Sequence, residues 1–150
     1  MPETKYGKYI VRKLKSNIKE ASWTNPVQVA GEGEGGRLLW LDNEMVPGAF
    51  YVETAWSHPV GLITEPKSVA ESHAHEFDEV LGMFGTDLND PYNLNGEVEF
   101  WLGDEKHIIT ESCIIFIPKG LNHCPLIYHR IDKPIFNFTT FQGKMYVEES

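Results

Sequence analysis

The chain has 150 residues, a length that favours one domain able to bury about two thirds of the surface of its unfolded state. A hydrophobic fraction of 41% and an aromatic fraction of 12% are typical of a folded protein and exclude a disordered one. The net charge of −9 argues against a nucleic-acid partner, and no apolar run approaches the roughly 18 residues of a membrane span.

The amino-terminal segment differs in charge from the rest of the chain. Residues 1–20 hold six Lys or Arg and two acidic residues, and we interpret them as solvated or as lying against the acidic body of this or a neighbouring chain. They contain no apolar segment like that of a secretory signal, and Cys113 and Cys124 do not suggest a disulfide framework. The cytoplasm is therefore the expected location.

Residues 9–22 carry two conflicting signals. Ile10, Leu14 and Ile18 recur every four residues, which favours a helix with one apolar stripe. The β-favouring run that begins at Tyr9 indicates a strand instead. The sequence leaves both structures open.

The remainder of the chain predicts an all-β fold. The expected strands are residues 37–41, 49–57, 59–64, 69–75, 79–84, 97–102, 107–117, 123–130 and 135–141. Many short strands with turns every 8–12 residues or so and no sustained helix indicate a barrel or a sandwich. The polar residues 86–95 are expected to form a loop, either a lid over the barrel mouth or a plain surface excursion.

The clearest chemical signal is the sequence His73-Ala74-His75 with Glu79 four residues later. Side chains alternate along a strand, so two histidines two residues apart face the same side and can converge on one ion. Four residues of straight strand span about 13 Å. Glu79 can therefore join the histidines only if residues 76–78 turn the chain.

A second signal lies in Pro118, Gly120 and His123. The proline and the glycine indicate a turn, and His123 after it would close the set from a separate hairpin. Three neutral imidazoles and one carboxylate suit a divalent transition metal, although they do not distinguish Fe, Mn, Ni, Zn and Cu.

The two motifs resemble those of the cupin family, in which HxH is followed by Glu and PxG is followed by His. The resemblance covers roughly residues 66–128. It implies a small antiparallel jelly-roll barrel, or double-stranded β-helix, with the metal ligands His73, His75, Glu79 and His123. We accordingly expect a single domain over residues 1–150, with a barrel core at 46–141 and an amino-terminal extension at 1–45 that packs on the barrel or on a partner chain.

The chain departs from the cupin pattern at four positions. Lys67 and Ser112 stand where the family has a leading glycine, and Ile127 stands where it has an asparagine. Gly85 comes one residue earlier than the glycine that usually follows the glutamate. None of these positions is a metal ligand in the family, so the departures concern loop shape and substrate.

Strand parity predicts the lining of the cavity. Leu81 and Met83 are in phase with Glu79, and Ile127 is in phase with His123, which predicts an apolar wall. Cys124, next to His123, should face away from the ion. No second acid or base on the motif strands is in phase with this wall.

The functional expectation is a metalloenzyme acting on a small oxygenated organic molecule, with dioxygenase-type chemistry slightly favoured over isomerase or lyase chemistry. The alternatives are a non-catalytic small-molecule or metal-binding module, which the missing acid or base favours, and a purely structural site. A homodimer is expected by analogy with small cupins, and no nucleic-acid or membrane partner is expected.

Overall fold

The structure of the chain is a computed structural model, which describes residues 4–16, 28–29 and 36–143. Within these residues, one 3₁₀ helix is the only element that is not a strand. In chain order the elements are η1 (Gly7–Tyr9), β1 (Gln28–Val29), β2 (Arg37–Leu41), β3 (Tyr51–Ser57), β4 (Gly61–Leu62), β5 (Glu79–Gly85), β6 (Asn93–Leu102), β7 (Glu105–Glu111), β8 (Cys113–Ile117), β9 (His123–Ile131) and β10 (Ile135–Phe141).

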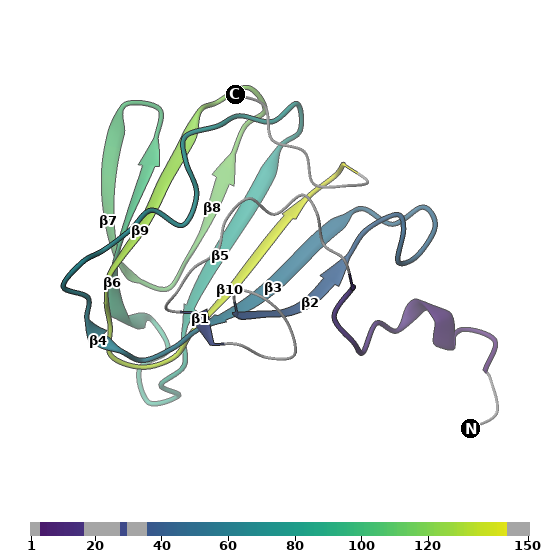
Figure 1. Cartoon of the computed structure of the whole chain (residues 1–150), viewed down its shortest axis with the longest axis horizontal. Helices are drawn as coiled ribbons and strands as arrows, with labels where there is room; N and C mark the ends of the chain where they lie inside the picture. The colour runs from purple at the N-terminus through teal and green to yellow at the C-terminus, as the bar shows by residue number, and fades with distance from the viewer. Residues whose placement is uncertain (1–3, 17–27, 30–35, 144–150) are drawn as a thin grey trace.

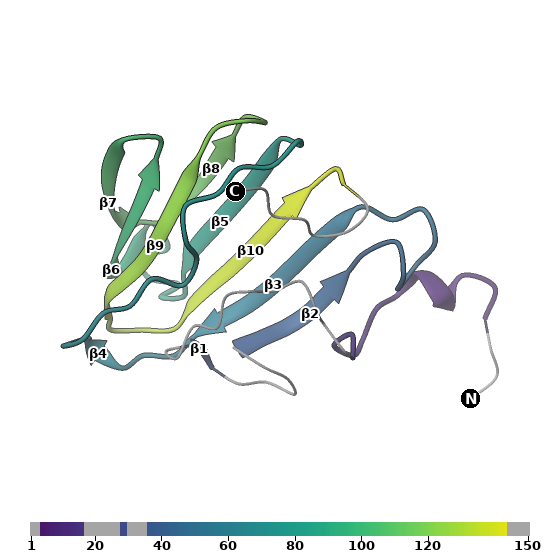
Figure 2. The same cartoon turned by 45° about the horizontal axis from the view of Figure 1, so that its top comes forward.

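The strands form two antiparallel sheets (Figures 1 and 2). Sheet A has the order β1-β3-β10-β5-β8, with β2 also paired to β3, and sheet B has the order β4-β9-β6-β7. The pairs are nested, because β3 pairs with β10, β4 with β9, β5 with β8 and β6 with β7. A long hairpin wound on itself in this way is a jelly roll, so the predicted all-β double-stranded β-helix is confirmed.

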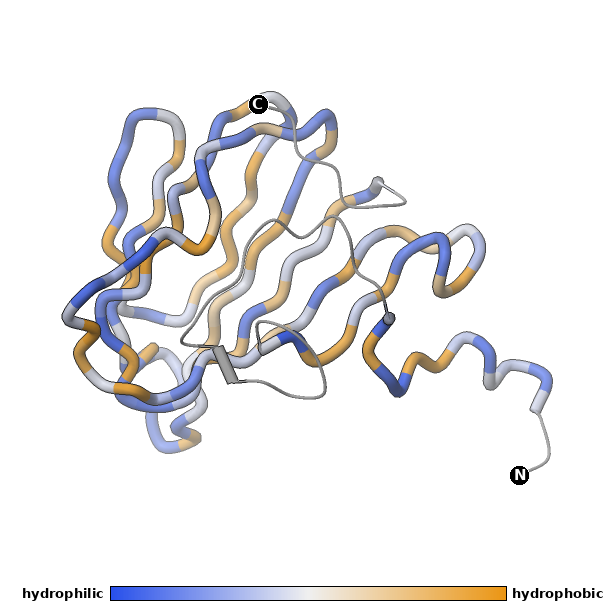
Figure 3. Tube along the Cα trace, viewed as in Figure 1, coloured by the Kyte–Doolittle hydropathy of each residue, from blue (hydrophilic) through white to orange (hydrophobic). Residues whose placement is uncertain are grey.

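The core lies between the two sheets and follows from the alternation of side chains along each strand. In β3 every second residue is buried, and the colouring of Figure 3 shows hydrophobic residues recurring along the strands. Leu94, Val98, Ile131 and Ile135 are completely buried. Burial of each such side chain contributes about 1.5–3 kcal/mol to folding.

The register of sheet A sets two rows of residues across its inner wall. Phe141 of β10 pairs with Tyr51 on one side and with Glu79 on the other. The next inward row pairs Thr139 with Glu53 and with Leu81. Residues of one row lie side by side, so these two rows bring β3 residues from outside the motifs next to the motif residues of β5.

Two of the predicted strands are not observed as single strands. Residues 69–75 form no strand, only an isolated bridge at His73. The predicted strand 107–117 is two strands, since the chain crosses from sheet B to sheet A at Ser112. The Ser112 hydroxyl donates to the Pro91 carbonyl oxygen at 2.6 Å and accepts from the Gly85 amide at 2.8 Å, which fixes this crossing.

The predicted loop 86–95 is shorter than expected, because β6 begins at Asn93. It joins the end of β5 to β6 and contacts the β9–β10 turn, where Lys133 Nζ bonds Asp87 at 2.8 Å. Glu79 lies at the opposite end of β5, about 20 Å away at 3.4 Å per residue. The loop is therefore a surface excursion and not a lid over the histidines.

The described amino-terminal segment contacts the barrel through Leu14 and Lys15, whereas η1 has no buried residue and projects away from the sheets (Figure 1). Residues 10–16 form neither the helix nor the strand considered from the sequence, and residues 17–22 of that segment lie outside the described residues. Leu14 packs against the buried cluster of Trp40, Tyr51 and Phe141, and Lys15 Nζ bonds Asp42 at 2.6 Å. No helix of the described residues has the length and hydrophobicity to cross a membrane.

Candidate metal centre

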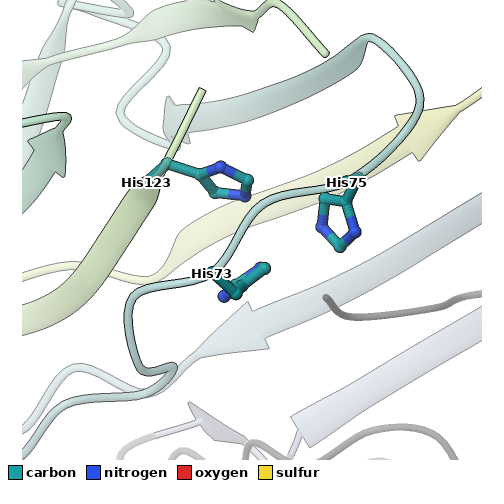
Figure 4. Close-up of side chains that lie close together, drawn as sticks. All are labelled: His73, His75 and His123. Carbon is teal, nitrogen blue, oxygen red and sulfur yellow. The ribbon is translucent and has the colours of Figure 1, made fainter. Parts of the chain in front are cut away.

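The three histidines of the two motifs lie together in the interior of the barrel (Figure 4). His73 and His75 belong to the segment before β5, and His123 is the first residue of β9. The amide of each of His73 and His123 donates to the carbonyl oxygen of the other, at 3.0 and 2.9 Å. Ligand nitrogens of all three imidazoles lie within 4.8 Å of one another, a group that could hold a metal ion.

Backbone carbonyls fix the orientation of two of these rings. His73 Nδ1 lies 2.6 Å from the carbonyl oxygen of Glu71, and His123 Nδ1 lies 2.9 Å from that of Leu121. A carbonyl oxygen only accepts, so Nδ1 carries the proton in both rings. Each Nε2 then presents its lone pair, which is the tautomer that metal-binding histidines adopt.

Glu79, the first residue of β5, lies beside two of the three histidines. Its Oε1 lies 3.0 Å from His123 Nε2, and its Oε2 lies 3.6 Å from His75 Nε2. The two motif loops are joined beside it, because the Lys119 amide donates to Asp78 Oδ1 at 3.0 Å and the Gly120 amide donates to the His75 carbonyl oxygen at 2.9 Å. The turn before Glu79 and the turn before His123 thus hold each other in place.

The cluster buries a carboxylate among neutral rings. Glu79 is 3% exposed and the imidazoles are 1–8% exposed. Among the ion pairs of the described residues, Glu79 is paired with histidines and with no Lys or Arg. A buried carboxylate without a compensating charge is costly, and a divalent cation bound by the same four side chains would supply that charge.

The donor set fits a transition metal. Nitrogen and carboxylate ligands bind such ions at about 2.0–2.2 Å, so two ligand atoms of one ion lie at most about 4.4 Å apart. The ligand nitrogens, all within 4.8 Å of one another, need only small side-chain shifts to reach that spacing. Imidazoles with one carboxylate suit Fe, Mn, Ni, Zn and Cu alike.

A small cavity of about 60 Å³ adjoins the cluster. It is lined by His73, Glu79 and His123, by apolar side chains that include Leu81 and Met83, and by polar side chains that include Tyr51, Tyr128, Asn137 and Thr139. This volume is about that of two water molecules and far below the 300–1,000 Å³ or so of a pocket for a drug-sized ligand. The cavity is therefore suited to a molecule of a few heavy atoms.

The alternation of inward-facing and outward-facing side chains is interrupted on β9. Three residues of β6, from Phe100 to Leu102, face four residues of β9, from Leu126 to His123. This bulge adds one residue to β9, so Leu126 and Tyr128 line the cavity and Ile127 does not. Cys124 also lines the cavity, contrary to the simple alternation, because it lies in the bulge with a φ of 76°.

Sequence analysis missed the polar side of the cavity. Tyr51 lies outside both motifs, and Tyr128 and Asn137 lie beyond the second, where the Tyr128 hydroxyl donates to Asn137 Oδ1 at 2.8 Å. A signal was present in β3, where Tyr51, Glu53 and Ser57 occupy buried positions of an alternating strand. Polar residues at core positions of a strand indicate a buried polar network.

The other histidines lie apart from the cluster. His58 and His107 are exposed. His129 Nε2 lies 2.9 Å from Glu99 Oε1 and does not line the cavity. The Glu99 carboxylate also accepts from Trp101 and, with these two hydrogen bonds, the pKa of Glu99 lies below its usual value.

No protein-family model and no curated protein matches the chain. Solved structures do resemble it. They include the Lactobacillus farciminis oxalate decarboxylase (formate complex), with a TM-score of 0.48, 16% identity, and coverage of 82% of this chain and 32% of that one. A recombinant oxalate oxidase in complex with glycolate has a TM-score of 0.47, 14% identity, and coverage of 87% and 63%.

A cupin protein from Bacteroides fragilis has a TM-score of 0.44, 12% identity, and coverage of 85% of this chain and 92% of that one. The chain thus spans nearly the full length of this cupin, but about a third of the decarboxylase and under two thirds of the oxidase. Of these three structures, one is named as a cupin. At such low identity the likeness concerns the fold alone and assigns no substrate.

Proposed function

We propose that this chain, a jelly roll of the cupin type, holds one divalent transition metal at His73, His75, Glu79 and His123 and acts on a small oxygenated organic molecule. The observation that carries the proposal is the burial of the Glu79 carboxylate among three imidazoles, two of which have their Nε2 lone pairs directed by hydrogen bonds from Nδ1 to backbone carbonyls. A bound cation compensates that charge, and coordination by the protein leaves positions for a ligand.

Such an ion, when bound, polarises a substrate oxygen or supports chemistry with dioxygen, depending on its identity. The chain's own residues restrict what reaches it. Leu81 and Met83 exclude water on one side, and the small volume excludes large substrates. Dioxygenase-type chemistry remains slightly favoured over isomerase or lyase chemistry.

The test begins with the metal content of the purified protein. We expect about one ion per chain, and loss of it in His123→Ala, which removes a ligand. His129→Ala, which removes a histidine outside the cluster, should retain the ion. Oxygen uptake and product formation are then measured with small diols, hydroxy acids and keto acids. Absence of metal in the wild-type protein would overturn the proposal.

A non-catalytic binding module is the second candidate. The sequence favoured this candidate because the motif strands carry no acid or base in phase with the cavity wall. The tyrosines that line the cavity argue against it, because a tyrosine can serve as an acid or a base. Ligands that bind the loaded protein without turnover under any condition of the panel would favour it. A purely structural site predicts instead that no small ligand perturbs the metal.

We also propose a homodimer, with residues 46–141 as the barrel core and residues 1–45 as an extension. The outward positions of β3, β5, β8 and β10 carry no charged residue, and Ile114 and Phe116 there are 65% and 58% exposed. Two ring pairs cover the middle of this face, Phe84 on Phe138 and Trp56 on Phe136. A contiguous exposed apolar face of this kind is typical of a protein–protein contact surface.

Sedimentation should therefore give twice the chain mass of 17.1 kDa. Phe116→Glu should give the monomer, whereas Tyr92→Glu, at a site 77% exposed outside this face, should leave the dimer intact. A monomeric wild-type protein would contradict the dimer without affecting the metal site. Location in the cytoplasm and the absence of nucleic-acid or membrane partners remain predictions from composition.

A further inference from the structure

Thr139 of β10 lies on the cavity wall, in the row of inward residues next to the row of Glu79. It pairs with Leu81 on one side and with Glu53 on the other. The two rows are two residues apart along the strand, which is about 7 Å. Thr139 and Glu79 both line the cavity, whose volume is about 60 Å³. A small molecule bound at the metal centre would therefore lie beside Thr139.

The alternation of β10 directs the Thr139 side chain inward. Ile135 and Phe141, which are in phase with it, are 0% and 2% exposed. Phe136, which is out of phase, packs on Trp56 on the outer face of the sheet. Thr139 faces the interior and is nevertheless only half-buried, so its accessible surface belongs to the cavity.

Two other polar side chains of the cavity wall have their donor hydrogens committed within the chain. The Tyr128 hydroxyl donates to Asn137 Oδ1 at 2.8 Å. Asn137 Nδ2 donates to Ser57 Oγ at 2.9 Å and to the Ile135 carbonyl oxygen at 3.3 Å, which uses both hydrogens of the amide. Neither Tyr128 nor Asn137 has a hydrogen left for a molecule in the cavity.

The Thr139 hydroxyl, in contrast, forms no hydrogen bond with the residues that the structure describes. Other threonines of sheet A bond the backbone, since Thr54 Oγ1 donates to the Leu39 carbonyl oxygen at 3.2 Å and Thr140 Oγ1 donates to that of Tyr51 at 2.7 Å. A polar group that is removed from water and left without a partner costs about 1–3 kcal/mol. The hydroxyl of Thr139 therefore indicates a partner inside the cavity.

Around Thr139 the cavity wall is largely apolar. Leu81 and Met83 of β5 line it and offer no hydrogen bond. The small volume admits a molecule of a few heavy atoms, so a ligand at the metal centre meets few polar groups besides this hydroxyl. The position of Thr139 then decides which atom of the ligand is polar.

The charge of the proposed metal site favours an anion. A divalent cation and the Glu79 carboxylate leave one net positive charge among three neutral imidazoles, and such a charge attracts a carboxylate. A ligand with its carboxylate at the metal extends toward Thr139 through a few covalent bonds.

Resting on the proposed metal site, we propose that Thr139 is a specificity-determining residue that hydrogen-bonds a second oxygen atom of the ligand at the metal. The substrate class is then short organic acids with a hydroxyl or carbonyl group close to the carboxylate. A threonine hydroxyl both donates and accepts, so it serves either group. An acid with a methyl group in that place leaves the hydroxyl without a partner and binds more weakly.

The experiment uses the full chain loaded with Co²⁺, whose visible spectrum reports ligand binding at the metal. Glycolate, the smallest hydroxy acid, and propionate are titrated into each variant. The two acids have nearly the same shape and differ by a hydroxyl in place of a methyl group. The glycolate hydroxyl is also able to bind the metal, so the quantity compared is the change that each substitution makes to the ratio of the two affinities.

Three variants locate the effect. Thr139→Val keeps the shape of the side chain and should weaken glycolate binding about tenfold, the effect of one hydrogen bond of roughly 1.4 kcal/mol, while propionate binding changes less than about twofold. Thr139→Ser retains a hydroxyl and should keep the ratio within about threefold of the wild type. Thr54→Val makes the same substitution at a threonine that bonds the backbone outside the cavity, and should leave the ratio unchanged. One bound Co²⁺ per chain verifies that each variant has folded.

The outcomes separate the two proposals. A wild-type chain that binds no Co²⁺ overturns the metal site and the role of Thr139 with it. Bound Co²⁺ whose spectrum neither acid changes leaves the metal site standing and overturns the role of Thr139. An equal loss of both affinities in Thr139→Val would mean that the side chain only shapes the cavity. An unchanged ratio would mean that water alone is the partner of the hydroxyl, and either result overturns the proposal.

Discussion

Two buried glutamates, Glu79 of β5 and Glu53 of β3, face the same interior from the two strands that flank β10 in sheet A, and they receive their compensating charge differently. Each is 2–3% exposed and lies in one of two adjacent inward rows. Glu53 pairs with Arg37, a cation that the chain itself supplies. Glu79 pairs with His75 and His123, which are neutral unless protonated.

The difference indicates which of the two carboxylates needs a cation from outside the chain. The desolvation of a carboxylate is offset only by a nearby charge or by several hydrogen bonds. At Glu53 the chain provides both, from Arg37 and from Tyr51. At Glu79 the nearest described groups are imidazole nitrogens, which are also good metal ligands. Removing the Arg37 side chain beside Glu53 should therefore destabilise the folded protein in the same way as removing the metal from the proposed site at Glu79.

The largest effect is expected from Arg37→Met, which leaves Glu53 buried without its cation. Loss of one partner of a buried pair costs about 3–5 kcal/mol of unfolding free energy. Urea denaturation of the metal-loaded protein measures it. Adding Glu53→Gln to this variant should recover part of the loss, because the uncompensated charge is then gone. A loss below about 1 kcal/mol would show that the pair is not the counterpart of the metal site.

Glu79→Gln gives the next largest effect and separates the two glutamates by their response to metal. Saturating metal at a hundred times its Kd should stabilise the wild-type protein by about 2.7 kcal/mol, and Glu79→Gln should remove most of this gain. In metal-free protein Glu79→Gln should be neutral or slightly stabilising. Glu53→Gln should leave the gain intact. Equal metal stabilisation in both variants would contradict the assignment of Glu79 as a ligand.

The pH dependence of stability should carry the signature of Glu53. Its pKa in the folded chain is raised above 4.5, chiefly by burial, so between these two values the folded state binds more protons than the unfolded state. Stability should then fall as pH rises through this window, by about 1.4 kcal/mol for each unit of pKa difference. Glu53→Gln should lack this slope. An unchanged slope in the variant would assign the dependence to other groups.

The sequence predicted an all-β barrel or sandwich because alternation of side chains and turn residues is a local property of each strand, and the resemblance of the two motifs to those of cupins supplied the jelly roll. Nesting of β3 with β10 and of β5 with β8 follows from the same short strands once they pair in two sheets. The motif spacing predicted that the histidines and Glu79 meet, although residues 69–75 reach the cluster as a bridged loop and not as a strand. Metal binding itself stays a prediction.

The remaining features of the fold and the site depend on how strands pair with one another. The residue pattern within a single strand does not predict that pairing. The bulge on β9 arises from its pairing with β6, and it moved the inward positions from Ile127 to Leu126 and Tyr128. The approach of Tyr51 and Glu53 to the motif residues depends on β10 lying between β3 and β5. Both facts are properties of the sheet register, which the amino-acid pattern of a single strand leaves undetermined.

The smallest effect is expected where an ion pair is exposed. Arg130 and Asp132 bond at 2.8 Å as Arg37 and Glu53 bond at 3.0 Å, but their side chains are 50% and 41% exposed. Water screens such a pair, so Arg130→Met should change the free energy of unfolding by less than about 1 kcal/mol. The same denaturation measurement applied to Arg37→Met and Arg130→Met compares two pairs of similar geometry that differ in burial. Similar losses in the two variants would mean that burial is not what makes the Glu53 pair matter, and the inference drawn for Glu79 would lose its basis.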